Sequence, residues 1–206
     1  TIDEWYRQHK ICVNQNDKYS FELGFATFYL NRTNRSGIIK GGVIGGLEQA
    51  GNWTMDVRFN REDLINRIQN IASRKKDIKL YNKDISSFIT NYVPLYEDNA
   101  FIYFDPPYYK KGKQLYMNYF SHEDHVRIES AIRQHINCDW IITYDDVKEI
   151  EEIYKDYQLY LYDLNYSVST KCKASELMIF GNDIVLPTNE MLLKEKIRIN
   201  LRPIAR

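Results

Sequence analysis

The sequence has no long apolar run and no excess of charge of either sign. No stretch approaches the roughly 18 residues of a membrane span, and the start, TIDEWYRQHK, has no signal-peptide core. The 28 basic side chains balance 28 acidic ones, so contact with nucleic acid must come from a local patch. These absences predict a globular chain in the cytoplasm, associated with the nucleoid if the source is prokaryotic, with no membrane partner.

Cysteine is scarce, and no metal-ligand spacing is present. Cys12, Cys138 and Cys172 are odd in number and far apart, which fits buried thiols in a reducing compartment better than a disulfide framework. His122 and His125 have no further ligands beside them, and both fit a helix N-terminus that faces solvent. We expect no metal.

The first third of the chain has helical periodicity. Three phenylalanines recur at helical spacing between Tyr19 and Leu30. A further helix is predicted after an N-cap at Asn60, with one apolar face made of Leu64, Ile65, Ile68, Ile71 and Ala72. The basic run Arg74–Lys76 falls in its last turn, where cations complement the helix dipole. We therefore interpret this run as a solvated helix end rather than a DNA patch.

The second half alternates short β-rich runs with helical patterns. Strands are predicted at DIKLY, AFIYF, DWIIT and LYLYDL, and helices over Ser121–Ile136 and Val147–Tyr154. This alternation is typical of a parallel α/β sheet with right-handed crossovers. LYLYDLNYSVST and ASELMIF have no helix between them, so they predict a hairpin that puts an antiparallel strand on the edge of an otherwise parallel sheet.

The stretch AFIYFDPPYYKKGK places Asp105 directly after a predicted buried strand, where ligands bind in such sheets. Pro106 and Pro107 stiffen the loop and leave its carbonyls free to accept hydrogen bonds. Tyr108 offers a flat face for stacking. An amino group on an aromatic ring fits this set, with its N–H bonds directed to a carboxylate and a carbonyl. The alternative is that the prolines only turn the chain and Tyr108 caps the core.

FIYFDPPYY, with FYLNRTNRSGI before it and ASELMIFGN after it, resembles the Dam-like (D12 class) family of DNA adenine-N6 methyltransferases over about Phe21 to Asn182. The resemblance implies a Rossmann-like methyltransferase fold with a target-recognition insertion and S-adenosylmethionine as methyl donor. It also implies double-stranded DNA as partner, a flipped-out target adenine, and a place in DNA methylation or restriction-modification. Asp105, Pro106, Pro107 and Tyr108 would be the catalytic loop.

Two further residues have a structural alternative beside the implied role. Phe120 stands where the family often has an aromatic residue and could close the adenine pocket, but a phenylalanine before a helix N-cap is more often a hydrophobic staple. Asp84, in LYNKDISSF, resembles the family's aspartate before the catalytic loop and, with Asp105, would contact the cofactor. Its alternative is an N-cap for the helix that follows.

The family's target-recognition region corresponds to about residues 31–58. Arginine and asparagine side chains suit phosphates and base edges, so we expect DNA contacts from Asn31, Arg32, Asn34 and Arg35 rather than an ordinary polar turn. GGVIGG lacks the preceding strand and the lysine of a phosphate loop, and predicts a flexible or closely packed recognition loop instead.

The family's main cofactor segment, a strand followed by a glycine-rich turn, has no counterpart in this sequence. We divide the chain into residues 1–76 with the recognition region, 77–186 with the catalytic sheet, and a charged tail over 187–206. The sequence leaves three alternatives: a C-terminal fragment, a chain completed by self-association or a companion chain, or a loss of catalysis.

Two classes of function remain after these observations. One is a DNA adenine-N6 methyltransferase, whole only with its missing segment. The other is a catalytically inactive DNA-binding module that keeps the base pocket and the recognition loop. Methylation of an amine in RNA or protein fits less well, because families with those substrates tend to carry asparagine at the position of Asp105.

Overall fold

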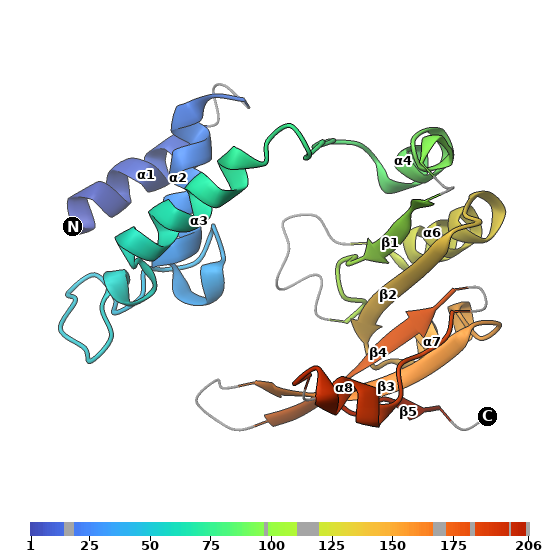
Figure 1. The fold of residues 1–206 in the computed structure, drawn as a ribbon. Helices are drawn as coiled ribbons and strands as arrows, with labels where there is room; N and C mark the ends of the chain where they lie inside the picture. Colours follow the sequence, from blue (N-terminus) through green and yellow to red (C-terminus); the bar gives the residue numbers. More distant parts are fainter. Residues whose placement is uncertain are drawn as a thin grey trace. The chain divides into compact units, whose positions relative to one another are not determined.

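Two units, Thr1–Tyr81 and Asn82–Arg206, make up the chain (Figure 1). The computed structural model describes residues 1–14, 19–96, 99–110, 120–166, 172–181, 184–197 and 199–204. None of the helices in these ranges is both long and apolar enough to cross a membrane.

The first unit is built on α1 (Ile2–Asn14), α2 (Phe21–Thr33) and α3 (Arg61–Ser73). The side chain of Ser20 accepts a hydrogen bond from a backbone N–H in the first turn of α2, and Asn60 does the same for α3. The helix predicted from Tyr19 and the N-cap predicted at Asn60 are therefore confirmed. Helices α1 and α2 close over a small core that includes Trp5, Cys12, Ala26, Leu30, Val43 and Met55.

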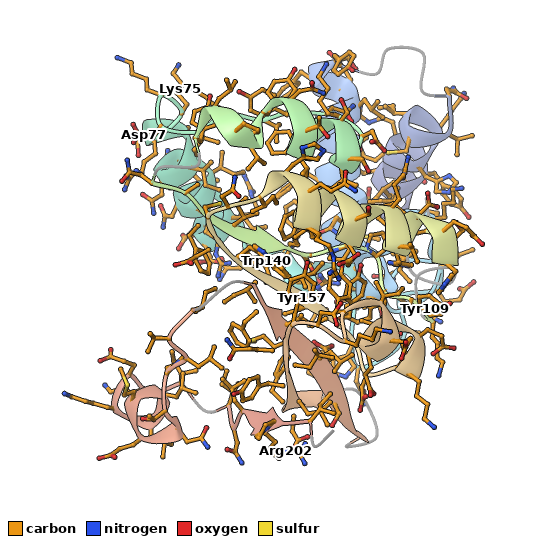
Figure 2. All side chains as sticks on the ribbon, turned by 90° about the vertical axis from the view of Figure 1, so that its right-hand side faces the viewer. Lys75, Asp77, Tyr109, Trp140, Tyr157 and Arg202 are labelled. Carbon is orange, nitrogen blue, oxygen red and sulfur yellow. The ribbon has the colours of Figure 1, made fainter. Side chains whose placement is uncertain are left out.

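The apolar stripe of α3 is present, but it is not buried within this unit. Leu64 is 8% exposed, whereas Ile65, Ile68 and Ile71 are 47%, 51% and 62% exposed. The basic run Arg74–Lys76 directly follows α3 instead of lying in its last turn, so that part of the prediction is wrong. Its side chains are exposed, as Figure 2 shows for Lys75, and their interpretation as a solvated helix end rather than a DNA patch stays a prediction.

Short 3₁₀ turns join α2 to α3. They are η1 (Arg35–Gly37) and η2 (Met55–Arg58), with an isolated bridge between Asn34 and Val43. The predicted recognition region consists of this segment and the last turn of α2, which carries Asn31 and Arg32, and it belongs wholly to the first unit.

The second unit combines a five-stranded sheet with helices. The strands are β1 (Phe101–Phe104), β2 (Asp139–Asp145), β3 (Gln158–Tyr166), β4 (Cys172–Phe180) and β5 (Arg202–Pro203). The helices are α4 (Ile85–Asn91), the turn η3 (Val93–Leu95), α6 (His122–His135), α7 (Lys148–Ile153) and α8 (Asn189–Lys194). Both helices predicted in this half, Ser121–Ile136 and Val147–Tyr154, are confirmed within one residue at each end.

The strand order is β1-β2-β4-β3-β5, and only β1 and β2 pair in parallel. The predicted hairpin is confirmed as β3 and β4, but β4 lies between β2 and β3 rather than at an edge. The prediction of a mostly parallel sheet is therefore wrong. The reason is burial: Leu177, Ile179 and Phe180 are at most 2% exposed, and a strand buried on both faces belongs inside the sheet.

The predicted strand DIKLY is also absent. Residues 78–84 form no regular structure, and Ile78 and Leu80 are 51% and 94% exposed. A strand needs a neighbour to complete its hydrogen bonds, and no described strand pairs with this segment, which lies at the boundary between the two units.

Each face of the sheet has its own core. On one face, α4, α6 and α7 supply Ile89, Ile128, Ile132, Ile150 and Tyr154, which cover Trp140, Ile142, Leu177 and Ile179. On the other face lies a smaller cluster of Tyr162, Phe180, Leu192 and Leu201. Successive strand residues point to opposite faces, so these clusters use alternating positions of β2, β3 and β4.

The described residues of the predicted charged tail, 187–197 and 199–204, pack on the sheet of the second unit. Helix α8 lies beside β3 and β5 (Figure 1), and its Leu192 is buried. Strand β5 pairs with β3, and Arg202 donates to Asp163 at 2.6 Å. The sequence prediction missed this because charged residues alternate with the apolar residues of the tail.

Candidate functional site

The loop after β1 begins directly after Phe104, the buried last residue of that strand. Asp105 follows and is exposed, while Pro106, Pro107 and Tyr108 are half-buried. The Asp105 carboxylate makes no hydrogen bond to any residue that the structure describes. It is therefore an acceptor available to a ligand, at the edge of the sheet where parallel strands place their ligands.

Tyr108 is tied down at its hydroxyl. It donates to Oε1 of Glu176 at 2.6 Å, and Tyr162 donates to Oε2 of the same carboxylate at 2.6 Å. Glu176 is 4% exposed. Such short bonds from a hydroxyl to an ionised carboxylate are among the stronger hydrogen bonds in proteins, so the ring of Tyr108 is held at its far end.

The backbone of the loop is fastened to the end of β2. Asp145 accepts from the N–H of Tyr109 at 2.8 Å and from the N–H of Lys110 at 2.9 Å. Its side chain is thus used entirely within the protein, and it fixes the chain that leaves the two prolines.

Sequence reasoning missed both Glu176 and Asp145. The signal was available: an acidic residue inside the apolar run ASELMIF, and another directly after the apolar strand DWIITY. A charge at a strand position that must be buried needs a partner, and the loop supplies it.

Tyr109, the next residue of the loop, contacts two histidines of α6. The hydroxyl of Tyr109 and Nδ1 of His122 are 3.0 Å apart, and the rings of Tyr109 and His125 are 5.2 Å apart. His122 is exposed as predicted, but His125 is fully buried, so the prediction that it faces solvent is wrong. The cause is its position one turn into the helix, on the face that covers the sheet.

The buried imidazole of His125 is only partly satisfied. Its Nδ1 lies 3.0 Å from the hydroxyl of Tyr144, whereas Nε2 has no hydrogen-bond partner among the described residues. Burial lowers the pKa of His125 below its ordinary value of 6.5, against the opposing effect of the Asp145 and Asp124 carboxylates. This side chain therefore favours the neutral form.

Phe120 occupies the staple position before α6. Its ring lies 5.6 Å from that of His125, while Ser121 and Asp124 form a capping box. The structural alternative for Phe120 is thus observed. Residues 111–119, which precede it, lie outside the described part of the chain, and its place in a base pocket stays a prediction.

Asp84 also shows its structural alternative. Oδ1 accepts from the N–H of Ser87 at 3.1 Å and caps α4, and Oδ2 lies 3.5 Å from a guanidinium nitrogen of Arg127. About half of the side chain is exposed, 52%. A cofactor contact from Asp84 stays a prediction.

The predicted recognition residues divide into two kinds. Arg32 donates twice to the carbonyl of Arg58, at 2.9 and 2.6 Å, and so supports the fold of the loop. Asn31 is exposed and donates to the carbonyl of Gly37 at 3.1 Å. Arg35 is exposed as well. Of these side chains, Arg35 and Asn31 are accessible to a partner.

Asn34 lies in the interior. It is 0% exposed; its oxygen accepts from the indole of Trp5 at 2.7 Å, and its nitrogen donates to the carbonyls of Ile38 and Ile39, both at 3.0 Å. In this arrangement the amide has no polar atom left for a base edge. Asn34 therefore joins α1 to the loop through these hydrogen bonds.

The glycine-rich run is folded by one glutamine. Gln49 donates to the carbonyls of Ile44 and Gly46 at 2.7 and 2.5 Å and accepts from the N–H of Met55 at 2.9 Å. Gly45 and Gly46 adopt positive φ angles of 82° and 71°, which glycine tolerates. Packing is close at Gly45, where an added Cβ would stand 2.5 Å from the Trp53 carbonyl oxygen, whereas Gly42 and Gly46 have no atom within 4 Å of an added Cβ. The flexible or closely packed recognition loop stays a prediction.

The described residues contain no cluster of three or more His, Cys, Asp or Glu side chains arranged to hold a metal ion. The predicted catalytic loop lies in the second unit and the predicted recognition region in the first, so the two sequence motifs fall in separate folded units.

No curated protein matches the chain. The model of the family "D12 class N6 adenine-specific DNA methyltransferase" matches residues 3–168, which include the recognition region and the loop at Asp105. The match spans most of the chain and both folded units. The chain therefore belongs to the D12 class N6 adenine-specific DNA methyltransferase family.

Proposed function

We propose that this chain takes part in methylating the exocyclic amine of adenine in double-stranded DNA, with the loop Asp105–Tyr108 holding the flipped-out base. One observation carries this proposal. An exposed carboxylate, Asp105, follows a parallel strand directly and stands three residues before Tyr108, whose ring is held by its hydroxyl.

The adenine amine is a weak nucleophile because its lone pair is delocalised into the ring. Hydrogen bonds from this amine to the Asp105 carboxylate and the Pro106 carbonyl would favour a pyramidal nitrogen with its lone pair directed at the methyl donor. The amine nitrogen would bond to the methyl carbon as the sulfur–methyl bond breaks and its electron pair stays on sulfur, and the nitrogen would then pass a proton to solvent. Asp105 therefore acts by orientation and charge and need not be a strong base.

Tyr108 would stack on the flipped base. A base on an aromatic ring gains about 1–3 kcal/mol, which offsets part of the cost of taking adenine out of the duplex. Phe120 is proposed for the other side of the base.

S-adenosylmethionine, when bound, supplies an electrophilic methyl group. The acceptors that this chain offers toward it are Asp105 and the exposed half of Asp84. Gly181, the described glycine directly after a strand, is a single glycine packed against the Trp140 indole and not part of a glycine-rich turn. We therefore propose that a glycine-rich segment outside this sequence, a companion chain or a second copy completes the cofactor site.

DNA contacts in the first unit are assigned to the accessible members of the recognition region. Arg35 suits phosphate or guanine, and Asn31 suits a base edge. Arg32 and Asn34 would act on DNA through the loop that they support.

A second candidate is a DNA-binding module without catalysis. It is favoured by the same observation on Gly181, since the described residues offer a base-holding loop but no glycine-rich turn after a strand.

Transfer of labelled methyl from S-adenosylmethionine to adenine-rich duplex DNA is the experiment that tests this proposal. If the chain is sufficient for catalysis, wild type transfers the label and Asp105→Ala reduces the rate by about 10²–10³-fold, the usual effect of losing one oriented polar group. DNA binding without transfer fits the target-binding part of a methyltransferase and also the inactive module. Transfer that appears once a chain with an apolar strand and a glycine-rich turn is added would then favour the methyltransferase, and its continued absence would favour the module. A chain that neither transfers methyl nor binds DNA would refute both candidates.

A further inference from the structure

Three buried polar side chains form a row across the sheet, on the face opposite the α6 core. Asp145 of β2 pairs directly with Glu176 of β4, and Glu176 pairs directly with Tyr162 of β3. Their exposed fractions are 8%, 4% and 7%. Residues paired in register point to the same face, so the row is continuous.

Burial of two carboxylates side by side is unfavourable unless hydrogen bonds compensate them. Here the compensation comes from one short stretch of chain. Asp145 takes the backbone N–H groups of Tyr109 and Lys110, and Glu176 takes the hydroxyl of Tyr108. The row thus holds three consecutive residues that follow the two prolines.

Glu176 accepts from two tyrosines, one on each oxygen. Tyr108 comes from the catalytic loop and Tyr162 from β3, and both bonds measure 2.6 Å. Because Tyr162 sits on a long strand of the sheet, its bond fixes which way the Glu176 carboxylate faces. That carboxylate in turn fixes the far end of the Tyr108 ring.

We propose that Glu176 and Tyr162 are positioning residues that set the plane of Tyr108 for stacking against adenine. A tyrosine ring turns about two bonds, and a tether at its hydroxyl removes that freedom before the base arrives. Without the hydrogen bond to Glu176, the free energy needed to order the Tyr108 ring would reduce the binding free energy of the base. This inference rests on the proposed function, because it concerns the base-holding loop of that function.

The test uses a duplex with a single bulged 2-aminopurine, a fluorescent adenine analogue that is quenched when it stacks. A bulged base is already unpaired, so neither a recognition sequence nor a methyl donor is needed. Wild type should quench the probe, and Tyr108→Ala should abolish the quench. Tyr162→Phe and Glu176→Gln should each weaken binding of the bulged base about fivefold, as expected for one lost hydrogen bond. Affinity for a plain duplex should stay unchanged.

Glu129→Gln is the matched control. Glu129 is also buried, at 8% exposure, and accepts from a tyrosine hydroxyl, that of Tyr157 at 3.3 Å, but it lies on α6. Glu129→Gln should destabilise the protein about as much as Glu176→Gln does, but it should leave the quenching of the 2-aminopurine probe unchanged. Thermal melting verifies that every variant is folded. If Glu176→Gln does not fold, Tyr162→Phe, which keeps the aromatic ring, tests the positioning role by itself.

Two outcomes overturn the inference in distinguishable ways. If Tyr108→Ala loses the quench while Tyr162→Phe and Glu176→Gln keep it, the base pocket stands and the positioning role is wrong. If wild type gives no quench, or Tyr108→Ala keeps it, the base does not stack on Tyr108, and that part of the proposed function fails together with this inference.

Discussion

Gly181 follows β4, lies against the indole of Trp140 and is the one glycine of the second unit that the structure describes. A Cβ atom at this position would stand 1.9 Å from Cε2 and 2.0 Å from Nε1 of that ring. The N–H of Gly181 also donates to the Trp140 carbonyl at 3.0 Å, so the two backbones cannot easily separate. We predict that Gly181→Ala destabilises this unit severely.

The magnitude follows from how little Trp140 can move. It is 1% exposed, and its ring packs edge-on against Tyr157, with ring centroids 5.1 Å apart, and against Phe104, with ring centroids 6.2 Å apart. Figure 2 labels Trp140 and Tyr157. Overpacking usually costs about 1–3 kcal/mol, and a clash with a rigid ring enclosed on both sides belongs at or above the upper end. Of a typical total of about 5–15 kcal/mol, a loss of about 3 kcal/mol is large.

The assay is urea unfolding followed by circular dichroism and by tryptophan fluorescence. Gly24→Ala is the control, because Gly24 lies inside α2 with no atom within 4 Å of an added Cβ. That change should stabilise the first unit by about 0.5–1 kcal/mol. A free energy of unfolding for Gly181→Ala within about 0.5 kcal/mol of wild type would refute the reasoning, since surface changes have effects of that size.

Three further predictions concern single side chains. Asn34→Ala should lower the free energy of unfolding of the first unit by about 1–3 kcal/mol, because it leaves the buried indole N–H of Trp5 without its acceptor and removes two hydrogen bonds to loop carbonyls. An unchanged midpoint in urea unfolding would contradict the role of Asn34 in joining α1 to the loop. Arg35→Ala should lower the slope of log affinity against log salt by about one for duplex DNA, and Lys75→Ala should leave it unchanged; equal effects would contradict the assigned surface. The folded-state pKa of His125 lies below 6.5, so an unfolded chain takes up this proton first, and stability should fall as the pH drops below about 6.5. His125→Gln should remove that part of the loss, measured by urea unfolding at about pH 7.5 and 5.5, and an equal loss in the variant would exclude His125 as its source.

Helices were predictable because their signals are local. The caps at Asn60 and Ser121 are bonds to an N–H three residues ahead, so sequence spacing already contains them. The strand order was not predictable in the same way. Only the burial of both faces of β4 explains why it enters the sheet between β2 and β3, and burial depends on the whole unit.

The candidate site shows the same division. Asp105 and Tyr108 stand in one loop, where their chemistry is readable from the sequence. Glu176 contacts Tyr108 across 68 positions and Asp145 contacts Tyr109 across 36, and no spacing rule joins them until the strand order is known. The order of the strands in the sheet brings these residues into contact.

Adjacent polar residues of the recognition region have opposite surroundings. Asn34 is buried and Arg35 is exposed, although both belong to the same polar turn. The difference is made by the indole of Trp5, which reaches Asn34 from 29 positions away. Composition predicts that such a turn is polar, but not which of its side chains remain accessible to DNA.

The most direct test of the account is a crystal structure of the chain with a duplex that carries one bulged adenine. The account predicts that the base lies on the ring of Tyr108, with its exocyclic nitrogen about 2.7–3.2 Å from Asp105 and from the Pro106 carbonyl, the range of N–H···O hydrogen bonds. An adenine that stays in the duplex, or that binds with its amine away from Asp105, would contradict it.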